Sequence, residues 1–360
     1  MGHYLLSPEL SALRGRVRAF VDERIVPAEQ AIMREDMEGS KTTLLGLQAQ
    51  ARQEGLWTPH LPVELGGLGL GVMGMCALFR EMGRSLVGAR VFNCDAPDQG
   101  NMDLLLSTAD DEDRERWLQP LANAEITSAF CMTEPAPGAG SDPSNLRTRA
   151  TEEPDGWRIY GHKWFSTGGG SASFLIVMAR TSDDPRTGAT MFLVDRHDPG
   201  VRHVRDVPVM APDLLTHREG EFFFKGARAK VLGGVGKGFR MAQQRLVPAR
   251  LTHCMRWLGL ADRTLHMCRE YLGTRTSFGK VLARHQMTQL KLATNARDIH
   301  AGNLMTLHCA QMLQDGLSKQ ARPYSSMCKD HIANTLLRTL DDAIQFHGAL
   351  GFSEDKPFAT

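Results

Sequence analysis

The spacing of apolar residues changes twice along the chain, and this order restricts the fold more than any other feature. Up to about residue 125 the apolar positions follow helical spacing, and Ser7-Pro8-Glu9 marks the start of a first helix. From about 126 to 235, short β-branched and aromatic runs bounded by Gly, Asp and Pro indicate strands, mainly antiparallel. After residue 235 the helical spacing returns in long segments. Helices therefore precede and follow a strand-rich middle.

The predicted fold class is an α+β multidomain protein. We predict an N-terminal helical domain over 1–125, a middle antiparallel β-domain over 126–235 and a C-terminal helical domain over 236–360. Junctions between helical bundles and a small β-domain leave clefts in which cofactors bind. The long helices near the C-terminus are predicted at 237–273, 285–315 and 324–348.

The composition excludes several classes of protein. The 360 residues are 42% hydrophobic and 23% charged, and the net charge of +1 gives no electrostatic case for nucleic acid or an anionic membrane. No apolar run approaches the roughly 18 residues that a membrane span needs. The seven cysteines are odd in number and include no Cys-x-x-Cys. This pattern favours free thiols in a cytoplasmic protein and gives no reason to expect a metal site.

Two glycine-rich passages, each after a predicted strand, are the first candidates for a binding site. They are "AFCMTEPAPGAGSD" and "GHKWFSTGGG". Because glycine has no Cβ, such a loop lets the backbone approach a flat ligand. Thr133, Ser141 and Ser166 would add hydroxyls, and Trp164 an aromatic face, which suits an aromatic heterocycle better than a phosphate. The alternative, which composition alone favours, is a pair of tight hairpin turns.

The sequence resembles the acyl-CoA dehydrogenase family in four segments that follow the family's order. These segments are "CMTEPAPGAGSD", "KWFSTGG", "RTSFGKVLARHQ" and "DAIQFHGALGF". The stretches "APDQGNM", "CMTEP" and "RLTHCMRWLGLADR" look like the branch whose animal members join the dehydrogenase to kinase-like domains. The resemblance extends over essentially the whole chain.

The resemblance implies a fold that ends in a four-helix bundle, with FAD between the β-domain and the C-terminal helices. It implies that the flavin ring is lined by Phe130, Met132, Thr133, Trp164 and Ser166, with the Ser166 hydroxyl near flavin N5. The FAD diphosphate of a neighbouring subunit is implied to contact Arg275, Ser277, Phe278 and Gln286, and the adenosine end Gln345, Gly348 and Ala349. The implied contacts of the substrate are Ser141 and Arg250.

The same resemblance implies an enzyme of fatty acid metabolism. Its substrate would be an acyl-CoA thioester, which loses hydrogens from its α and β carbons, and its electrons would pass to an electron-transfer flavoprotein. Because some residues serve a neighbour's FAD, it also implies a homodimer or a dimer of dimers (a homotetramer).

The sequence departs from the family pattern in three ways. The loop after Glu134-Pro135 is about two residues longer, and Ala349 replaces the second glycine of a Gly-Gly pair. The third departure concerns the base that removes the α-proton. One position used by some relatives holds Ala249 here, and the other lies after the segment that ends at Thr360. We therefore expect no catalytic residue within 1–360 and an incomplete C-terminal domain. The alternatives are a flavin-dependent oxidase or monooxygenase on the same fold, or a non-catalytic FAD-binding subunit.

Overall fold

A computed structural model of the chain describes residues 6–34, 37–140, 142–184, 187–210 and 218–358. The contacts within the chain define two units. Unit 1 comprises Met1–Gln30, Gly69–Val91 and Val247–Thr360, and unit 2 comprises Ala31–Leu68 and Phe92–Leu246. The sequence-based domain boundaries remain a prediction, because these units divide the first 125 residues differently.

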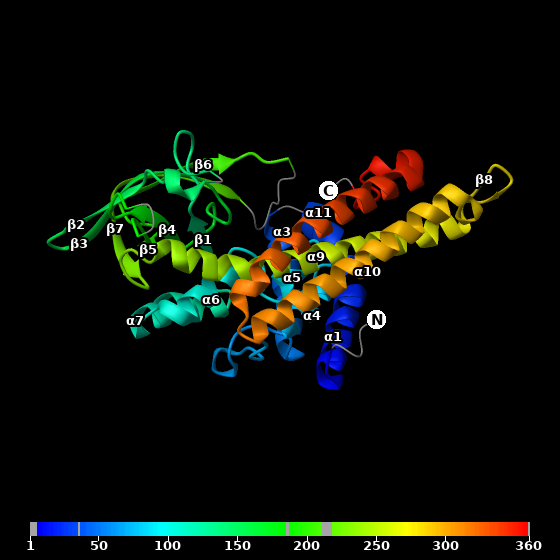
Figure 1. Ribbon diagram of the computed structural model, residues 1–360, viewed down its shortest axis with the longest axis horizontal. Helices are drawn as coiled ribbons and strands as arrows, with labels where there is room; N and C mark the ends of the chain where they lie inside the picture. The colour runs from blue at the N-terminus through cyan, green and yellow to red at the C-terminus, as the bar shows by residue number, and fades with distance from the viewer. Residues whose placement is uncertain (1–5, 35–36, 141, 185–186, 211–217, 359–360) are drawn as a thin grey trace. The chain divides into compact units, whose positions relative to one another are not determined.

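Unit 2 is built on a seven-stranded sheet (Figure 1). The strand order is β1-β4-β2-β3-β7-β5, β6 pairs with β7, and β4 also pairs with β5. The pairings from β4 through β2, β3, β7 and β5 therefore return to β4. The strands are β1 (Ser128–Cys131), β2 (Arg149–Glu153), β3 (Gly156–Ser166), β4 (Phe174–Arg180), β5 (Ala189–Asp195), β6 (Val201–Val207) and β7 (Glu219–Leu232).

The sheet is mixed rather than purely antiparallel. Most pairings are antiparallel as predicted, but β1 runs parallel to β4, with Ser128 opposite Phe174. β2 also meets β4 in parallel, at Arg149 and Arg180. A parallel neighbour needs a long crossover, and residues 132–173 supply it between β1 and β4. The predicted antiparallel domain is corrected in this respect.

Alternate residues of β4 enter two different cores. Ile176 and Met178 belong to a core shared with Leu105 of α6, whereas Leu175 and Val177 belong to a second core. Burial on both faces explains why the β4 sequence is a continuous apolar run instead of an alternating one. The helices of unit 2 are α3 (Met37–Gln53), α6 (Asp98–Thr108), α7 (Asp111–Asp113), α8 (Gln119–Ala122) and the first turns of α9 (Gly238–Thr274).

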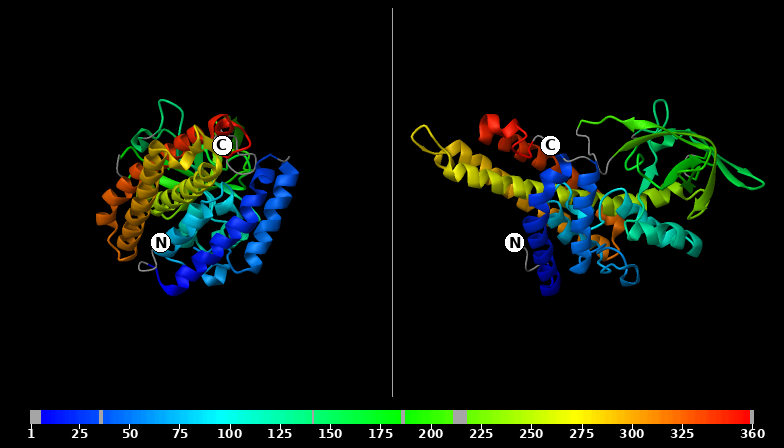
Figure 2. Two further views of the ribbon diagram at one scale, coloured as in Figure 1. Left: turned by 90° about the vertical axis from the view of Figure 1, so that its right-hand side faces the viewer. Right: turned by 180° about the vertical axis from the view of Figure 1, so that it is seen from behind.

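Unit 1 is helical. The α10 and α11 helices pack along each other, and α4 packs against both α10 and α1 (Figure 2). The first helix begins as predicted, because Ser7 Oγ accepts a hydrogen bond from Leu10 N and Pro8 stands in the first turn. The helices of unit 1 are α1 (Pro8–Phe20), α4 (Val72–Met82), α5 (Gly88–Val91), α10 (Gln286–Gln314), α11 (Ser318–His347) and most of α9. The α2 helix (Val26–Arg34) begins in this unit. Two short strands, β8 (Thr276–Ser277) and β9 (Lys280–Val281), form a hairpin in it.

The α4 and α9 helices approach each other through glycines. A Cβ at Gly259 of α9 would clash with the carbonyl oxygen of Arg80 in α4. A Cβ at Gly83, the C-cap of α4, would clash with the backbone of Arg256. These two positions therefore set how closely the helices pack. No helix in the described ranges is long and apolar enough to cross a membrane.

Candidate functional site

The ends of β1 and β3 bring together the first group of predicted site residues. Trp164 N, near the end of β3, donates a hydrogen bond of 3.1 Å to Thr133 O, just after β1. Phe130, Met132, Thr133 and Trp164 are all partly exposed. A ligand can therefore reach these four residues along one edge of unit 2.

Ser166, the fifth residue predicted at the flavin ring, is more deeply buried than this group. Its exposed fraction is 1%, and its hydroxyl forms no hydrogen bond with the residues that the structure describes. Burial raises the pKa of the neighbouring Cys131 thiol to about 11, and the Lys163 charge partly offsets this shift. Buried hydroxyls normally have a hydrogen-bond partner, so the Ser166 hydroxyl has capacity for a ligand, and its contact with flavin stays a prediction.

A break in the pairing of β3 with β7 explains why the Ser166 side chain is buried. The register between β3 and β7 shifts between Lys163 and Ser166, and an irregularity of this kind reverses which side chains face inward. Phe165 has φ +47° and is 44% exposed. Thr167, which is also partly exposed, donates its hydroxyl to the Glu219 carboxylate at 3.0 Å. Phe165 and Thr167 are thus accessible neighbours of Trp164.

A buried ion pair holds the segment after β1. Lys163 is fully buried and Glu134 is 4% exposed, and the Lys163 Nζ to Glu134 Oε1 distance is 2.9 Å. Burial raises the pKa of Glu134, but the Lys163 charge and hydrogen-bond donors outweigh it and hold that pKa at about 2. Because β3 also carries Arg158 and His162, no local pattern in the sequence marks Lys163 as a buried lysine. Its partner, 29 residues earlier, could be found only from the fold.

A second polar cluster lies at the N-terminal end of α6, in the stretch "APDQGNM". Arg245 of α9 places its guanidinium 4.3 Å from the centre of the Phe130 ring. Its Nε donates to Asn101 Oδ1 at 3.1 Å, and Asn101 Nδ2 donates to Ser128 Oγ at 2.9 Å. Asp98 accepts hydrogen bonds from the backbone and hydroxyl of Ser128 at the start of β1. This cluster anchors the start of β1 and holds the Phe130 ring against Arg245.

The β8–β9 hairpin of unit 1 carries the second group of predicted residues. Arg275 N caps α9 by donating to Tyr271 O, and Arg275 O accepts from Leu282 N at 2.8 Å. Phe278 stands at the tip with φ +52° and is 92% exposed. Arg275 is exposed and Ser277 is partly exposed. Gln286, also exposed, is the first residue of α10.

The remaining predicted residues lie on α9 and after α11. Gln345 is exposed near the end of α11, and Gly348 ends this helix with φ +61°, which glycine adopts easily. Ala349 is exposed beside it. Arg250 is partly buried on α9. Ser141, a predicted substrate contact, lies outside the described residues.

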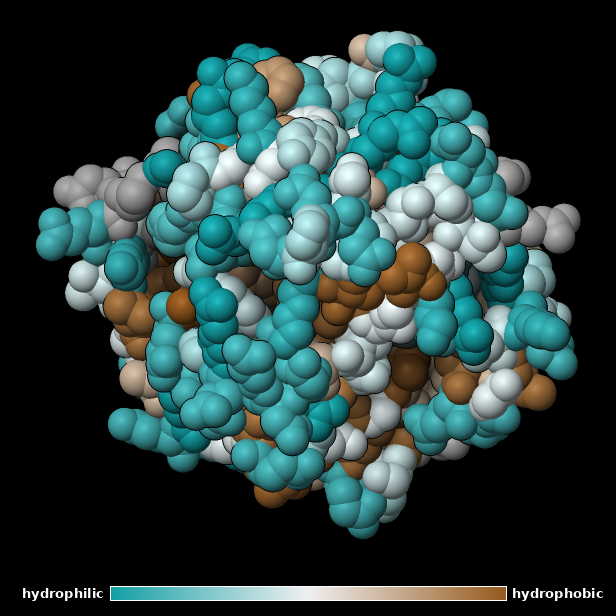
Figure 3. All heavy atoms as spheres, turned by 90° about the vertical axis from the view of Figure 1, so that its left-hand side faces the viewer, coloured by the Kyte–Doolittle hydropathy of each residue, from teal (hydrophilic) through white to brown (hydrophobic). Residues whose placement is uncertain are grey.

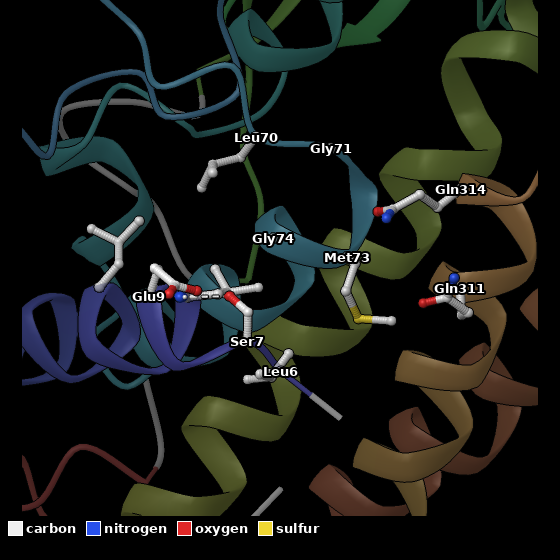
Figure 4. Close-up of a pocket in the computed structure, with 11 residues that line it drawn as sticks. Leu6, Ser7, Glu9, Leu70, Gly71, Met73, Gly74, Gln311 and Gln314 are labelled. Carbon is white, nitrogen blue, oxygen red and sulfur yellow. Dashed lines mark hydrogen bonds between the residues drawn. The ribbon is translucent and has the colours of Figure 1, made fainter. Parts of the chain in front are cut away.

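A pocket of about 470 Å³ lies elsewhere in unit 1 (Figure 4). It is formed by the start of α1, the start of α4 and the end of α10, and none of the predicted site residues lines it. Its wall combines apolar and amide side chains, including Leu6, Leu70, Met73, Gln311 and Gln314.

On the face that carries the β2–β3 hairpin in Figure 1, hydrophilic side chains cover most of the surface (Figure 3).

Comparison with known proteins assigns the family. The chain matches the N-terminal domain of acyl-CoA dehydrogenases at residues 7–125, the middle domain at 129–225 and the C-terminal domain at 236–360. This chain belongs to the acyl-CoA dehydrogenase family. The predicted fold class, with helical, β and helical parts in this order, is confirmed. The assignment also confirms the prediction of a family of oxidoreductases that use FAD.

Individual relatives show how far the similarity extends. The chain is 35% identical to "Probable acyl-CoA dehydrogenase FadE2" of Mycobacterium tuberculosis, over 87% of this chain and 78% of that protein. It is 32% identical to "Acyl-CoA dehydrogenase family member 10" of Mus musculus, over 98% of this chain but only 34% of that protein. The chain thus spans about a third of that curated relative, and 46% of family member 11 proteins. The crystal structure of an acyl-CoA dehydrogenase from Geobacillus kaustophilus matches with a TM-score of 0.84 and 25% identity, over 100% of this chain and 92% of that one.

Proposed function

We propose that this member of the acyl-CoA dehydrogenase family binds FAD and removes hydrogens from the α and β carbons of an acyl-CoA thioester. The observation that carries the proposal is its 35% identity to the Mycobacterium tuberculosis relative over 78% of that protein's length. The three family domains, matched in order along the chain, support it.

The described residues fit a flavin ring at the ends of β1 and β3. Phe130, Met132, Thr133 and Trp164 are accessible there, and the hydrogen bond from Trp164 to Thr133 keeps the two strand ends together. Bound FAD would supply the acceptor for the hydride that leaves the substrate's β carbon. The protein would hold the ring with the partly exposed side chains and the adjoining backbone. Ser166 belongs to the same proposal, in which its buried hydroxyl would lie near flavin N5.

The exposed hairpin of unit 1 suits the diphosphate of FAD. Arg275 presents a permanent positive charge that can pair bidentately with a phosphate, and Ser277 adds a hydroxyl. We propose that these residues, with Phe278 and Gln286, bind the FAD of a neighbouring subunit, and that Gln345, Gly348 and Ala349 lie near its adenosine. The protein would then act as a homodimer or a dimer of dimers.

Further parts of the proposal concern substrate, acceptor and location. Ser141 and Arg250 would contact the acyl-CoA, an electron-transfer flavoprotein would take the electrons, and the protein would work in fatty acid metabolism in the cytoplasm. Loss of the α-proton requires a base within hydrogen-bond reach of the α carbon. Position 249 does not supply it, because the Ala249 side chain is a methyl group.

The test is anaerobic mixing of the purified, FAD-loaded protein with a panel of acyl-CoA thioesters. We expect bleaching of the oxidised flavin band, followed by reduction of an added electron-transfer flavoprotein. Because Ala249 supplies no base, bleaching should be slow and Ala249→Glu should speed it. Oxygen consumption with peroxide or a hydroxylated product would instead indicate an oxidase or monooxygenase. A protein that takes up no FAD would refute the proposal.

A further inference from the structure

The Lys163–Glu134 pair is buried next to the backbone that the proposed function assigns to the flavin. Lys163 Nζ donates both to Glu134 Oε1 and to Met132 O, at 2.9 Å each. The next residue, Trp164, donates its backbone N–H to Thr133 O at 3.1 Å. Two consecutive residues of β3 thus bind two consecutive carbonyls after β1. The position of residues 132 and 133 depends on where β3 holds the Lys163 ammonium.

The Glu134 carboxylate organises the loop on its other side. Oε1 accepts the Thr148 N–H at 2.8 Å, and Oε2 accepts the N–H groups of Arg147 at 2.7 Å and Ala139 at 3.2 Å. Glu134 N also donates to Ala139 O at 2.7 Å. A single carboxylate therefore closes the turn 134–139 and ties it to the backbone that leads into β2. A Cβ at Gly138 would clash with Glu134 Oε2, so this turn requires glycine.

Burial makes this arrangement depend on both charges. Removing one partner of a buried pair leaves an uncompensated charge in a medium that solvates it poorly. Without Lys163 the carboxylate would turn toward water and release the three N–H groups that it holds. The backbone of Met132 and Thr133 and the glycine-rich loop would then move together.

We propose that Lys163 and Glu134 are positioning residues that act through the backbone of Met132 and Thr133 to shape the flavin-binding edge of unit 2. The inference rests on the proposed function, because the proposed function places the flavin at that edge. Neither side chain is accessible, so neither touches FAD or substrate. They set the geometry of the groups that do.

Two variants test the proposal, with one control. Lys163→Met removes the ammonium, and Gly138→Ala displaces the carboxylate while keeping both charges. Lys225→Met on the adjacent strand β7, where the lysine is exposed, is the control. Apoprotein is titrated with FAD at a temperature below unfolding, and the absorption spectrum and reduction potential of the bound flavin are recorded. Amide hydrogen exchange at Ala139, Arg147 and Thr148 is measured on the same proteins without FAD.

Both variants should speed exchange at these three amides, weaken FAD binding about tenfold and shift the flavin spectrum and potential. The control should change none of these. Normal FAD affinity, spectrum and potential in both variants, despite faster exchange, would overturn the positioning role and leave a purely structural pair. Failure of the unmodified protein to bind FAD would refute the proposed function itself. This outcome is distinct, because it is measured on the unmodified protein and not on the variants. If Lys163→Met does not fold, Gly138→Ala decides alone.

Discussion

Asp103 on α6 is a carboxyl group whose ionisation the fold disfavours. Burial raises its pKa from 3.8 to about 7, although the nearby Arg245 opposes this shift. The amide of Gln99, one turn earlier on α6, donates to its Oδ2. The folded state therefore favours the protonated carboxyl more strongly than the unfolded chain does. Its contribution to stability is complete below pH 3.8 and is lost as the pH rises toward 7.

Asp103→Asn should raise stability at pH 8 but not at pH 4, because asparagine resembles the protonated acid at every pH. We expect a gain of about 1 kcal/mol at pH 8, reduced from the full shift because the side chain keeps some contact with solvent. Urea unfolding at both pH values measures it. Asp341→Asn, at an exposed position on α11, is the control and should show the same small effect at both. A gain that is equal at pH 4 and pH 8 would refute the assignment.

Arg275→Ala should lower the affinity for FAD. Loss of a charge-assisted pair with the diphosphate costs about 1.5–3 kcal/mol, which corresponds to a tenfold or larger rise in the dissociation constant. Flavin fluorescence during titration of the apoprotein measures this constant. Arg269→Ala changes an exposed arginine on α9 and should leave it unaltered. Equal affinities of the two variants for FAD would show that Arg275 does not bind the diphosphate.

At the scale of elements, the contact between α4 and α9 offers a sharp comparison. Gly259→Ala would drive a methyl group into the Arg80 carbonyl, and overpacking of this kind costs about 1–3 kcal/mol. Gly273→Ala on the same helix meets no atom within 4 Å and should stabilise by up to about 1 kcal/mol, since alanine favours helix. Thermal unfolding should therefore move in opposite directions. A loss of stability in both variants would contradict the packing argument.

The elements also show what the sequence can predict. The α9 and α10 helices were predicted within one residue at each end, because their apolar spacing is long and regular. The prediction for α11 began six residues late, and Pro323 lies inside this helix although proline usually ends one. The α6 helix was not predicted as a separate element, and Asp98 and Asn101 at its start bind Ser128 and Arg245.

The sequence indicated that two strands end in glycine-rich passages, and the structure brings these ends together at Thr133 and Trp164. Their contact with flavin stays a prediction. The inward orientation of Ser166 was not predictable, because a register shift inside β3 depends on pairing with β7. The parallel pairing of β1 with β4, and the meeting of Lys163 with Glu134, arise from contacts that no local pattern encodes.

At the scale of the whole molecule, several large apolar side chains remain in solvent. Met287 and Leu290 lie three residues apart on α10 and are 66% and 60% exposed, and Phe278 at the hairpin tip is 92% exposed. Exposure of such residues beside Arg275 and Gln286 supports the proposed second subunit on this part of unit 1. The diphosphate site and the subunit contact would then share the same elements.

Assembly and FAD binding should therefore be coupled by mass action. Dilution should release FAD as the dimer dissociates, and Leu290→Glu should weaken both association and FAD retention. Sedimentation over a dilution series, with flavin fluorescence read on the same samples, measures both. Val63→Glu, at another exposed apolar position in unit 2, is the control. A monomer that retains its FAD would refute the coupling between assembly and FAD binding.

The seven cysteines, which are all buried and form no disulfide, have a practical consequence. In the folded protein a water-soluble thiol reagent finds no accessible sulfur, so the rate of labelling reports transient opening of the region around each cysteine. Cys94 and Cys131 lie in unit 2, whereas Cys76, Cys254 and Cys328 lie in unit 1. Mass spectrometry of the labelled peptides would thus follow the opening of each unit separately, without any engineered probe. A single cysteine placed on the surface would in turn be the one rapidly reacting position for a fluorescent dye.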